Sequence, residues 1–146
     1  FDATNWPGGQ NIMTSPANWG RVFEVLPSKN LGLALDPSHF VWQMIDCGEA
    51  IRAFKDRIYH VHLKDIKFKP EELAHRGVMA YPLDIMDPKI PGYGDVDWSD
   101  FISQLTMVGY NGDCCLEIED RFFEDTREHL VQSIELAKRY MDQFII

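Results

Sequence analysis

Three short apolar runs in this chain end in residue types that bind metal ions: Asp36, His62 and Glu117. The runs are residues 31–36 (LGLALD), 58–65 (IYHVHLKD) and 113–120 (DCCLEIED). Side chains alternate between the two faces of a β-strand, so each candidate ligand shares its face with small or polar residues, opposite leucine, valine and isoleucine. Carboxylate and imidazole ligands together suit Mn²⁺, Mg²⁺, Co²⁺ or Zn²⁺, and no thiolate is placed to select zinc. The spacing therefore predicts a divalent-cation site at the C-terminal ends of three strands.

Helical patterns separate these strands. Starts such as Ser15-Pro16 and Asp46, and the break at Gly109, predict helices over residues 16–26, 46–56, 97–109 and 125–144, with strands over 31–36, 58–64 and 113–118. This order indicates an α/β fold with parallel strands and crossover helices. Three parallel strands alone would leave both sheet edges unpaired, and a barrel needs eight. We expect residues 1–146 to be the C-terminal segment, about strands 6–8 and their helices, of one (β/α)8 TIM-barrel domain whose N-terminal half is absent from this chain.

Two further segments carry structural expectations. Residues 66–94 form a long insertion rich in proline and glycine, and we expect an irregular lid or specificity loop over the active face. Glu119 and Asp120 come after the third strand and are expected to be solvated. The last helix should carry Leu130, Ile134, Ala137 and Met141 on one side.

Composition bounds the class of protein. The formal net charge is −9 with no basic run, which disfavours a nucleic-acid partner. No apolar run approaches the roughly 20 residues needed to span a bilayer, so we expect no membrane partner. The three cysteines are odd in number and two are adjacent, a pattern that suits no disulfide framework and favours a reducing cytoplasm.

Four segments resemble the xylose-isomerase-like sugar phosphate isomerase/epimerase barrels: GLALDPSHFVWQMID (32–46), RIYHVHLKD (57–65), PGYGDVDW (91–98) and GYNGDCCLEIED (109–120). NWPGGQNIMTSP (5–16) is similar to the family's loop after its fifth strand. The resemblance implies that Asp36, His62 and Glu117 bind one or more divalent ions and that His39 faces the substrate. It also implies a fourth ligand, a glutamate ending the fifth strand, which nothing here matches. We therefore expect residue 1 to follow that strand.

The resemblance implies enediolate chemistry on a small-molecule sugar or polyol. The cation stabilises the enediolate as a Lewis acid, and Glu117 serves as an acid/base. The leading hypothesis is a divalent-metal-dependent sugar, sugar phosphate or polyol-ketone isomerase or epimerase. Alternatives are an inosose-type dehydratase and a catalytically incomplete fragment or binding module. An apurinic-site endonuclease is disfavoured by the charge and by the few candidate ligands. The chain would need its missing N-terminal half, or a second copy, as a partner.

Several residues keep two readings. Asp36 precedes Pro37 and is also a residue type that caps turns and helices. Lys64 suits either an ion pair or a substrate contact. His60 lies one layer below His62 on the same face and is expected to pack there and support the ligands from behind. Trp6 either stacks on the substrate as part of a lid or simply packs.

Overall fold

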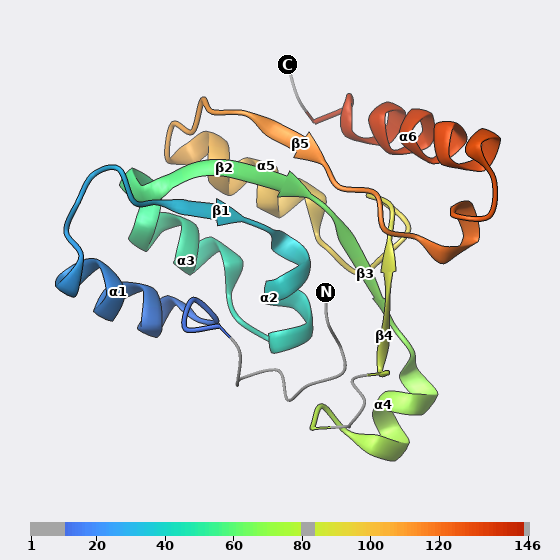
Figure 1. Cartoon of the computed structure of the whole chain (residues 1–146), viewed down its shortest axis with the longest axis horizontal. Helices are drawn as coiled ribbons and strands as arrows, with labels where there is room; N and C mark the ends of the chain where they lie inside the picture. The colour runs from blue at the N-terminus through green and yellow to red at the C-terminus, as the bar shows by residue number, and fades with distance from the viewer. Residues whose placement is uncertain (1–10, 80–83, 145–146) are drawn as a thin grey trace.

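A computed structural model of the protein describes residues 11–79 and 84–144. Its main sheet contains three parallel strands, β1 (Leu33–Leu35), β2 (Ile58–Leu63) and β5 (Cys114–Leu116), in the order β1-β2-β5 (Figure 1). Ala34 pairs with His60, and His62 pairs with Cys115, so the candidate ligands stand on neighbouring strands. The expected α/β fold with a parallel sheet is confirmed, although each strand is shorter than the sequence predicts.

The helices begin where capping residues stand. Helices α1 (Pro16–Val25), α3 (Cys47–Phe54), α5 (Trp98–Met107) and α6 (Arg127–Met141) follow Ser15, Asp46, Asp97 and Thr126. Each capping side chain accepts a hydrogen bond from a backbone amide of the first turn, which satisfies a donor that the helix itself leaves unpaired. A 3-10 turn, η1 (Lys55–Arg57), joins α3 to β2. No helix among the described residues is long and apolar enough to cross a membrane.

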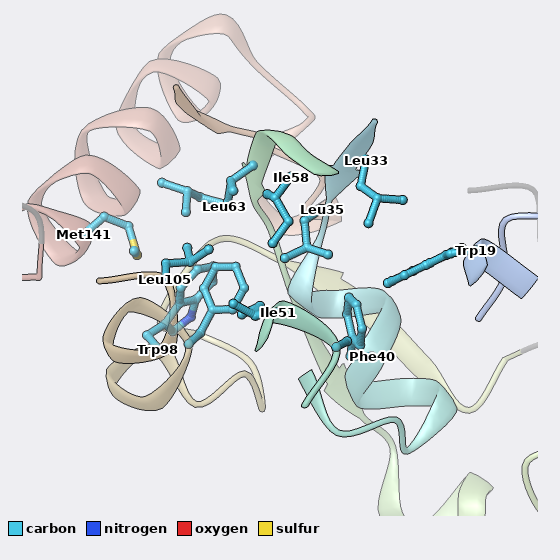
Figure 2. Close-up of a cluster of buried hydrophobic side chains, with 13 residues drawn as sticks. Trp19, Leu33, Leu35, Phe40, Ile51, Ile58, Leu63, Trp98, Leu105 and Met141 are labelled. Carbon is cyan, nitrogen blue, oxygen red and sulfur yellow. The ribbon is translucent and has the colours of Figure 1, made fainter. Parts of the chain in front are cut away.

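The core lies on one face of the sheet. Figure 2 shows Leu33, Leu35 and Leu63 of the strands packed toward Ile51 of α3 and Trp98 of α5. All five side chains are at most 6% exposed. The opposite face, which we call the open face, carries the exposed Ala34 and Cys115, the partly exposed His60 and His62, and Glu117 just beyond β5. This division follows the alternation of side chains along each strand.

The insertion contains regular structure that the sequence analysis did not predict. Strands β3 (Asp65–Phe68) and β4 (Met86–Lys89) pair antiparallel, and helix α4 (Pro70–Arg76) follows β3. Ile66, Ile85 and Met86 form a small second core. Figure 1 shows this unit extending from the C-terminal end of β2. A short helix after β1, α2 (Pro37–Gln43), was also missed; it ends at Met44, whose φ of 57° is left-handed.

The apolar side of the last helix is buried only in its second half. Ala137 and Met141 are buried, but Leu130 and Ile134 are 41% and 44% exposed. The C-terminal end of α6 lies near β5, the last strand in the sheet order, and its first turns extend away from the sheet (Figure 1). The 3-10 turn η2 (Arg121–Phe123) and β5 contact this helix, but Leu130 and Ile134 remain partly exposed among the described residues. Periodicity identified the apolar side correctly but could not show what covers it.

Candidate functional site

Asp36, His62 and Glu117 come together at the C-terminal edge of the main sheet. Asp36 follows β1 directly, His62 lies in β2, and Glu117 follows β5, with its backbone N–H donating to the carbonyl of Leu63. One candidate ligand atom from each residue lies within 4.8 Å of the others. The three side chains line a cavity of about 560 Å³, a volume typical of small-molecule sites. The sequence pattern that put these three residues on one face of the sheet thus corresponds to a cluster in the structure. Their roles as metal ligands remain predictions.

Both readings of Asp36 fit its geometry. The Oδ1 atom accepts hydrogen bonds from the backbone N–H of Ser38 at 2.9 Å and from its hydroxyl at 2.7 Å, which caps helix α2. The Oδ2 atom lies 3.4 Å from Nε2 of His39. Burial raises the pKa of Asp36, and the hydrogen bond from the Ser38 side chain opposes that shift. The cap uses one carboxylate oxygen and orients the other toward the cavity residues.

Glu117 lies between two basic side chains. Its Oε1 atom is 3.0 Å from Nζ of Lys64, and its Oε2 atom is 2.5 Å from Nδ1 of His62. Burial alone would raise the pKa of Glu117, but the hydrogen bond and charge of Lys64, together with His62, outweigh burial and lower the pKa. The side chain is therefore held as a carboxylate, the form needed by a metal ligand or a general base.

Lys64 forms an ion pair with Glu117, which was one of the two roles expected for it. The side chain is only 4% exposed, and its ammonium also lies 2.9 Å from Oε2 of Glu119. Burial would lower the pKa of Lys64, yet the hydrogen bonds to Glu119 and Glu117 raise it. The expectation that Glu119 is solvated holds only in part, because its side chain is 35% exposed but is also paired with the buried ammonium. A substrate contact by Lys64 remains a prediction.

The other predicted site residues surround this cluster. His39 lines the cavity, and its Nδ1 atom accepts a hydrogen bond from Nε1 of Trp42 at 3.4 Å. Trp42, which the sequence analysis missed, thereby helps to orient His39 beside Asp36. The His60 ring packs edge-on against that of His62 with centroids 5.1 Å apart, as its place one layer deeper suggests. Trp6 falls outside the described residues.

Two other buried carboxylates at this edge were not anticipated. Asp65 is fully buried and accepts five hydrogen bonds, from the backbone N–H groups of Ile66, Gly92, Gly94 and Val96 and from the indole of Trp98. Burial raises the pKa of Asp65, and these donors oppose that shift. Asp120, expected to be solvated, is 1% exposed and accepts from Nζ of Lys89 and the backbone N–H of Ile90. That expectation is wrong because β4 returns across the end of β5 and covers Asp120.

Known proteins resemble this chain in sequence and in fold. An inosose dehydratase from Geobacillus kaustophilus is 26% identical over 127 residues, which cover 86% of this chain and 40% of that protein. The structure of a D-allulose 3-epimerase from Methylomonas sp. in complex with D-allulose matches 92% of this chain and 43% of its own, with a TM-score of 0.62 and 20% identity. The IolI protein with a bound zinc atom matches 88% and 44%, with a TM-score of 0.65 and 18% identity.

The chain spans less than half the length of each of these proteins. The matches to solved structures concern the fold, which here is part of a barrel. The model of one family, described as the xylose isomerase-like TIM barrel, matches residues 3–140, almost the whole sequence. The chain therefore belongs to the xylose isomerase-like TIM barrel family.

Proposed function

We propose that this chain is the C-terminal segment of a divalent-metal-dependent enzyme that isomerises or epimerises a sugar, a sugar phosphate or a polyol-ketone. The observation that carries the proposal is the cluster of Asp36, His62 and Glu117 in the 560 Å³ cavity. Proton removal next to a carbonyl needs a positioned carboxylate and stabilisation of the enediolate oxygen. The open face carries groups of both kinds at one end of the sheet.

The donor set fits a divalent cation. Asp36, through its oxygen not used by the helix cap, together with the His62 ring and the Glu117 carboxylate, would hold the ion. Two carboxylates and one imidazole suit Mn²⁺, Mg²⁺, Co²⁺ or Zn²⁺. When bound, the cation acts as a Lewis acid on the oxygen atoms of a hydroxy-ketone. The zinc atom of the IolI structure supports a metal in this family, and the choice of metal for this chain is part of the proposal.

The chain's own residues would bind the substrate and move its proton. Glu117 is the proposed base, because Lys64 and His62 keep it ionised at the edge of the cavity. His39 would donate to or accept from a substrate hydroxyl beside Asp36. A second carboxylate on the opposite side of the substrate, and a fourth ligand, would come from an N-terminal half of the barrel. The uncovered open face and exposed Leu130 and Ile134 support a partner of that kind.

A second candidate is dehydration of an inosose-type substrate. The Geobacillus kaustophilus relative, matched over 86% of this chain, bears the name inosose dehydratase. Such a reaction begins with the same proton removal next to a carbonyl and continues with loss of a hydroxide from the neighbouring carbon. The same cluster therefore serves either outcome. We also expect the protein to act on a small molecule in the cytoplasm.

Incubation in D₂O with candidate substrates tests both reactions. The full-length protein that contains this chain is treated with a chelator and reloaded with each of the four metals. It is then mixed with ketoses, their phosphates and an inosose, and ¹H NMR follows the products. Exchange of the α-proton with rearrangement supports isomerisation or epimerisation, and loss of water supports the dehydratase. Glu117→Gln should lower exchange by about 10²–10⁴-fold. Substrate binding without exchange by any metal-loaded form would indicate a binding module and overturn the proposal.

A further inference from the structure

A second cavity of about 380 Å³ adjoins the one that holds the candidate ligands. Trp42 and Lys64 line both cavities and therefore form the boundary between them. We propose that the second cavity binds a further sugar ring attached to the reacting one, which makes the preferred substrate a glycoside rather than a free monosaccharide. This inference rests on the proposed function and adds a substrate class to it.

The walls of the second cavity are tied together. One wall is the β3–β4 hairpin and the other is the segment after β5. The buried Asp120 joins them, since its Oδ1 atom lies 3.0 Å from Nζ of Lys89 and its Oδ2 atom accepts from the backbone N–H of Ile90. The Lys89 ammonium also lies 4.4 Å from the ring centre of Phe122. We call these contacts of Asp120 the latch. Because the latch fixes the distance between the two walls, the cavity is preformed, as ligand pockets usually are.

Part of the lining of the second cavity is apolar and includes an aromatic ring. It is formed by Trp42, Ile66, Met86 and Pro88. Ile66 and Met86 are only 3% and 7% exposed, so Trp42 and Pro88 provide most of the apolar surface that a ligand could contact. A pyranose ring has an apolar face of C–H groups and an edge of hydroxyls. Flat apolar side chains, tryptophan above all, can cover the first, and polar groups around them can bind the second. This surface suits a ring with one apolar face.

The polar groups around the cavity favour hydroxyls over an anion. They are Lys64, Asp84, Asp87, Glu119, Arg121 and Glu124. Four carboxylates against two cations would repel a phosphate. The Lys64 ammonium is already bound to Glu117 and Glu119. Lys69 neutralises part of the acidic charge, at 2.5 Å from Asp84 and 3.0 Å from Asp87, but it adds no cation to the lining. Carboxylates accept hydrogen bonds from neutral hydroxyls, and Arg121 can donate to them.

The shared lysine also connects the second cavity to the chemistry. Glu119 lines only the second cavity and Glu117 only the first, while Lys64 bridges the two carboxylates at 2.9 and 3.0 Å. A ring bound beside Glu119 would therefore lie next to the ammonium that orients the proposed base. Binding remote from the reacting carbon can then raise turnover as well as affinity.

The test compares a ketohexose, the same ketohexose bearing a glucosyl substituent, and the ketohexose phosphate. Arg121→Ala removes a donor that lines the second cavity, and Glu124→Trp fills the cavity from its rim. The matched control, Arg127→Ala, removes an equally exposed positive charge at the start of α6, away from the cavity. Steady-state kinetics gives kcat/KM for each sugar, and ligand-observed NMR gives binding without turnover. The NMR measurement still reports which sugars bind if the protein does not catalyse the proposed reaction.

We expect wild type to prefer the glucosyl sugar, and Arg121→Ala and Glu124→Trp to lower that preference about tenfold, the effect of one hydrogen bond to a charged group. Arg127→Ala should leave it unchanged. Glucosyl-sugar binding that both variants weaken, without turnover of any sugar, would retain the second cavity and reject the proposed reaction. Turnover of the free sugar with no preference for the glucosyl sugar would reject the second cavity alone. A preference for the phosphate that Arg121→Ala removes would replace the sugar ring with an anion.

Discussion

Two carboxylates, the buried Asp65 and the partly exposed Glu117, follow adjacent strands at the same sheet edge, yet their surroundings differ in kind. Asp65, after β2, accepts all five of its hydrogen bonds from neutral donors, four of them backbone amides. Within the described part of the chain, the carboxylate of Glu117, after β5, pairs with ionisable side chains, Lys64 and His62. Neutral backbone donors fix a loop in place. Ionisable partners tune a charge and can exchange for a ligand, so the contrast separates a structural anchor from the proposed reactive site.

The Asp65 anchor also explains a glycine. A Cβ on Gly94 would overlap both the Asp65 carboxylate and the carbonyl of Ile66. The backbone of residues 92–96 can thus approach the carboxylate closely enough for three of its amides to donate. Trp98, which begins α5 and sits in the main core, donates the fifth hydrogen bond. Asp65 therefore joins the loop, a helix and β2 in one network.

Removing the anchor should give the largest loss of stability. Asp65→Ala leaves five donors without their acceptor, and each buried unsatisfied donor costs about 1–3 kcal/mol. Since water can reach some of these donors, we expect a total loss of about 3–5 kcal/mol in the free energy of unfolding, measured by urea denaturation. The control is Asp113→Ala, an exposed aspartate, which should change that free energy by about 0.5 kcal/mol or less. A loss below about 1 kcal/mol for Asp65→Ala would show that Asp65 is not a structural anchor.

Glu117→Gln should show the opposite pattern. The substitution keeps the shape of the side chain, and the amide can still accept from Lys64, so we expect the free energy of unfolding to fall by about 1 kcal/mol or less. Proton exchange should fall by about 10²–10⁴-fold, because an amide cannot take up the proton. Parallel urea denaturation and NMR exchange on the same sample check both. A variant that unfolds much more easily would make Glu117 a structural anchor like Asp65.

The latch between the two cavity walls should have an intermediate effect. Lys89→Met removes the cation beside Asp120 and leaves a 1% exposed carboxylate with fewer partners. Losing one partner of a buried ion pair costs up to about 3–5 kcal/mol, and we expect about 1–3 kcal/mol here because backbone donors remain. Thermal unfolding measures the loss. The double variant Lys89→Met with Asp120→Asn should recover part of it, and failure to recover would show that the pair does not act as a unit.

A surface pair gives the weakest effect and a predictable pH dependence. The hydrogen bond and charge of Lys69 lower the pKa of the exposed Asp84. A lowered folded-state pKa gives stabilisation that is present above the unfolded pKa of about 4 and is lost as the pH falls through the folded value. Lys69→Gln should therefore cost at most about 1 kcal/mol at pH 7 and progressively less below about pH 4. Thermal unfolding of both proteins across that range checks the sign, and a difference that grows on acidification would contradict it.

The sequence predicts the candidate metal cluster better than it predicts the buried carboxylates Asp65 and Asp120. The phase of Asp36, His62 and Glu117 depends only on local alternation within strands, and the structure places them within 4.8 Å of one another. Four of the five donors to Asp65 lie 27 to 33 residues further along the chain. Ile90 and Lys89, two of the donors to Asp120, lie 30 and 31 residues earlier. No local pattern reveals such pairings. Strand-end aspartates near glycine-rich segments such as PGYGDVDW are the one signal that points to them.

The same limit explains the expectations that are wrong or hold only in part. Glu119 and Asp120 looked solvated because they follow a strand, but the unpredicted β3–β4 hairpin supplies Lys89 and Ile90 beside Asp120, and the buried Lys64 attracts Glu119. The spacing of Leu130 and Ile134 predicts only that they share the apolar side of the last helix. Their exposure depends on which elements surround α6, which is a tertiary property that periodicity does not contain.

Metal binding by paired histidine variants tests the central claim most directly. His60 and His62 share a strand and a face, but only His62 belongs to the three-residue cluster. We predict that chelator-treated wild-type protein binds Mn²⁺ in isothermal titration calorimetry. His62→Asn should weaken that binding at least about tenfold, and His60→Asn should weaken it less. Equal affinities for the two variants and the wild type, or no binding by any of them, would contradict the assignment of Asp36, His62 and Glu117 as a metal site.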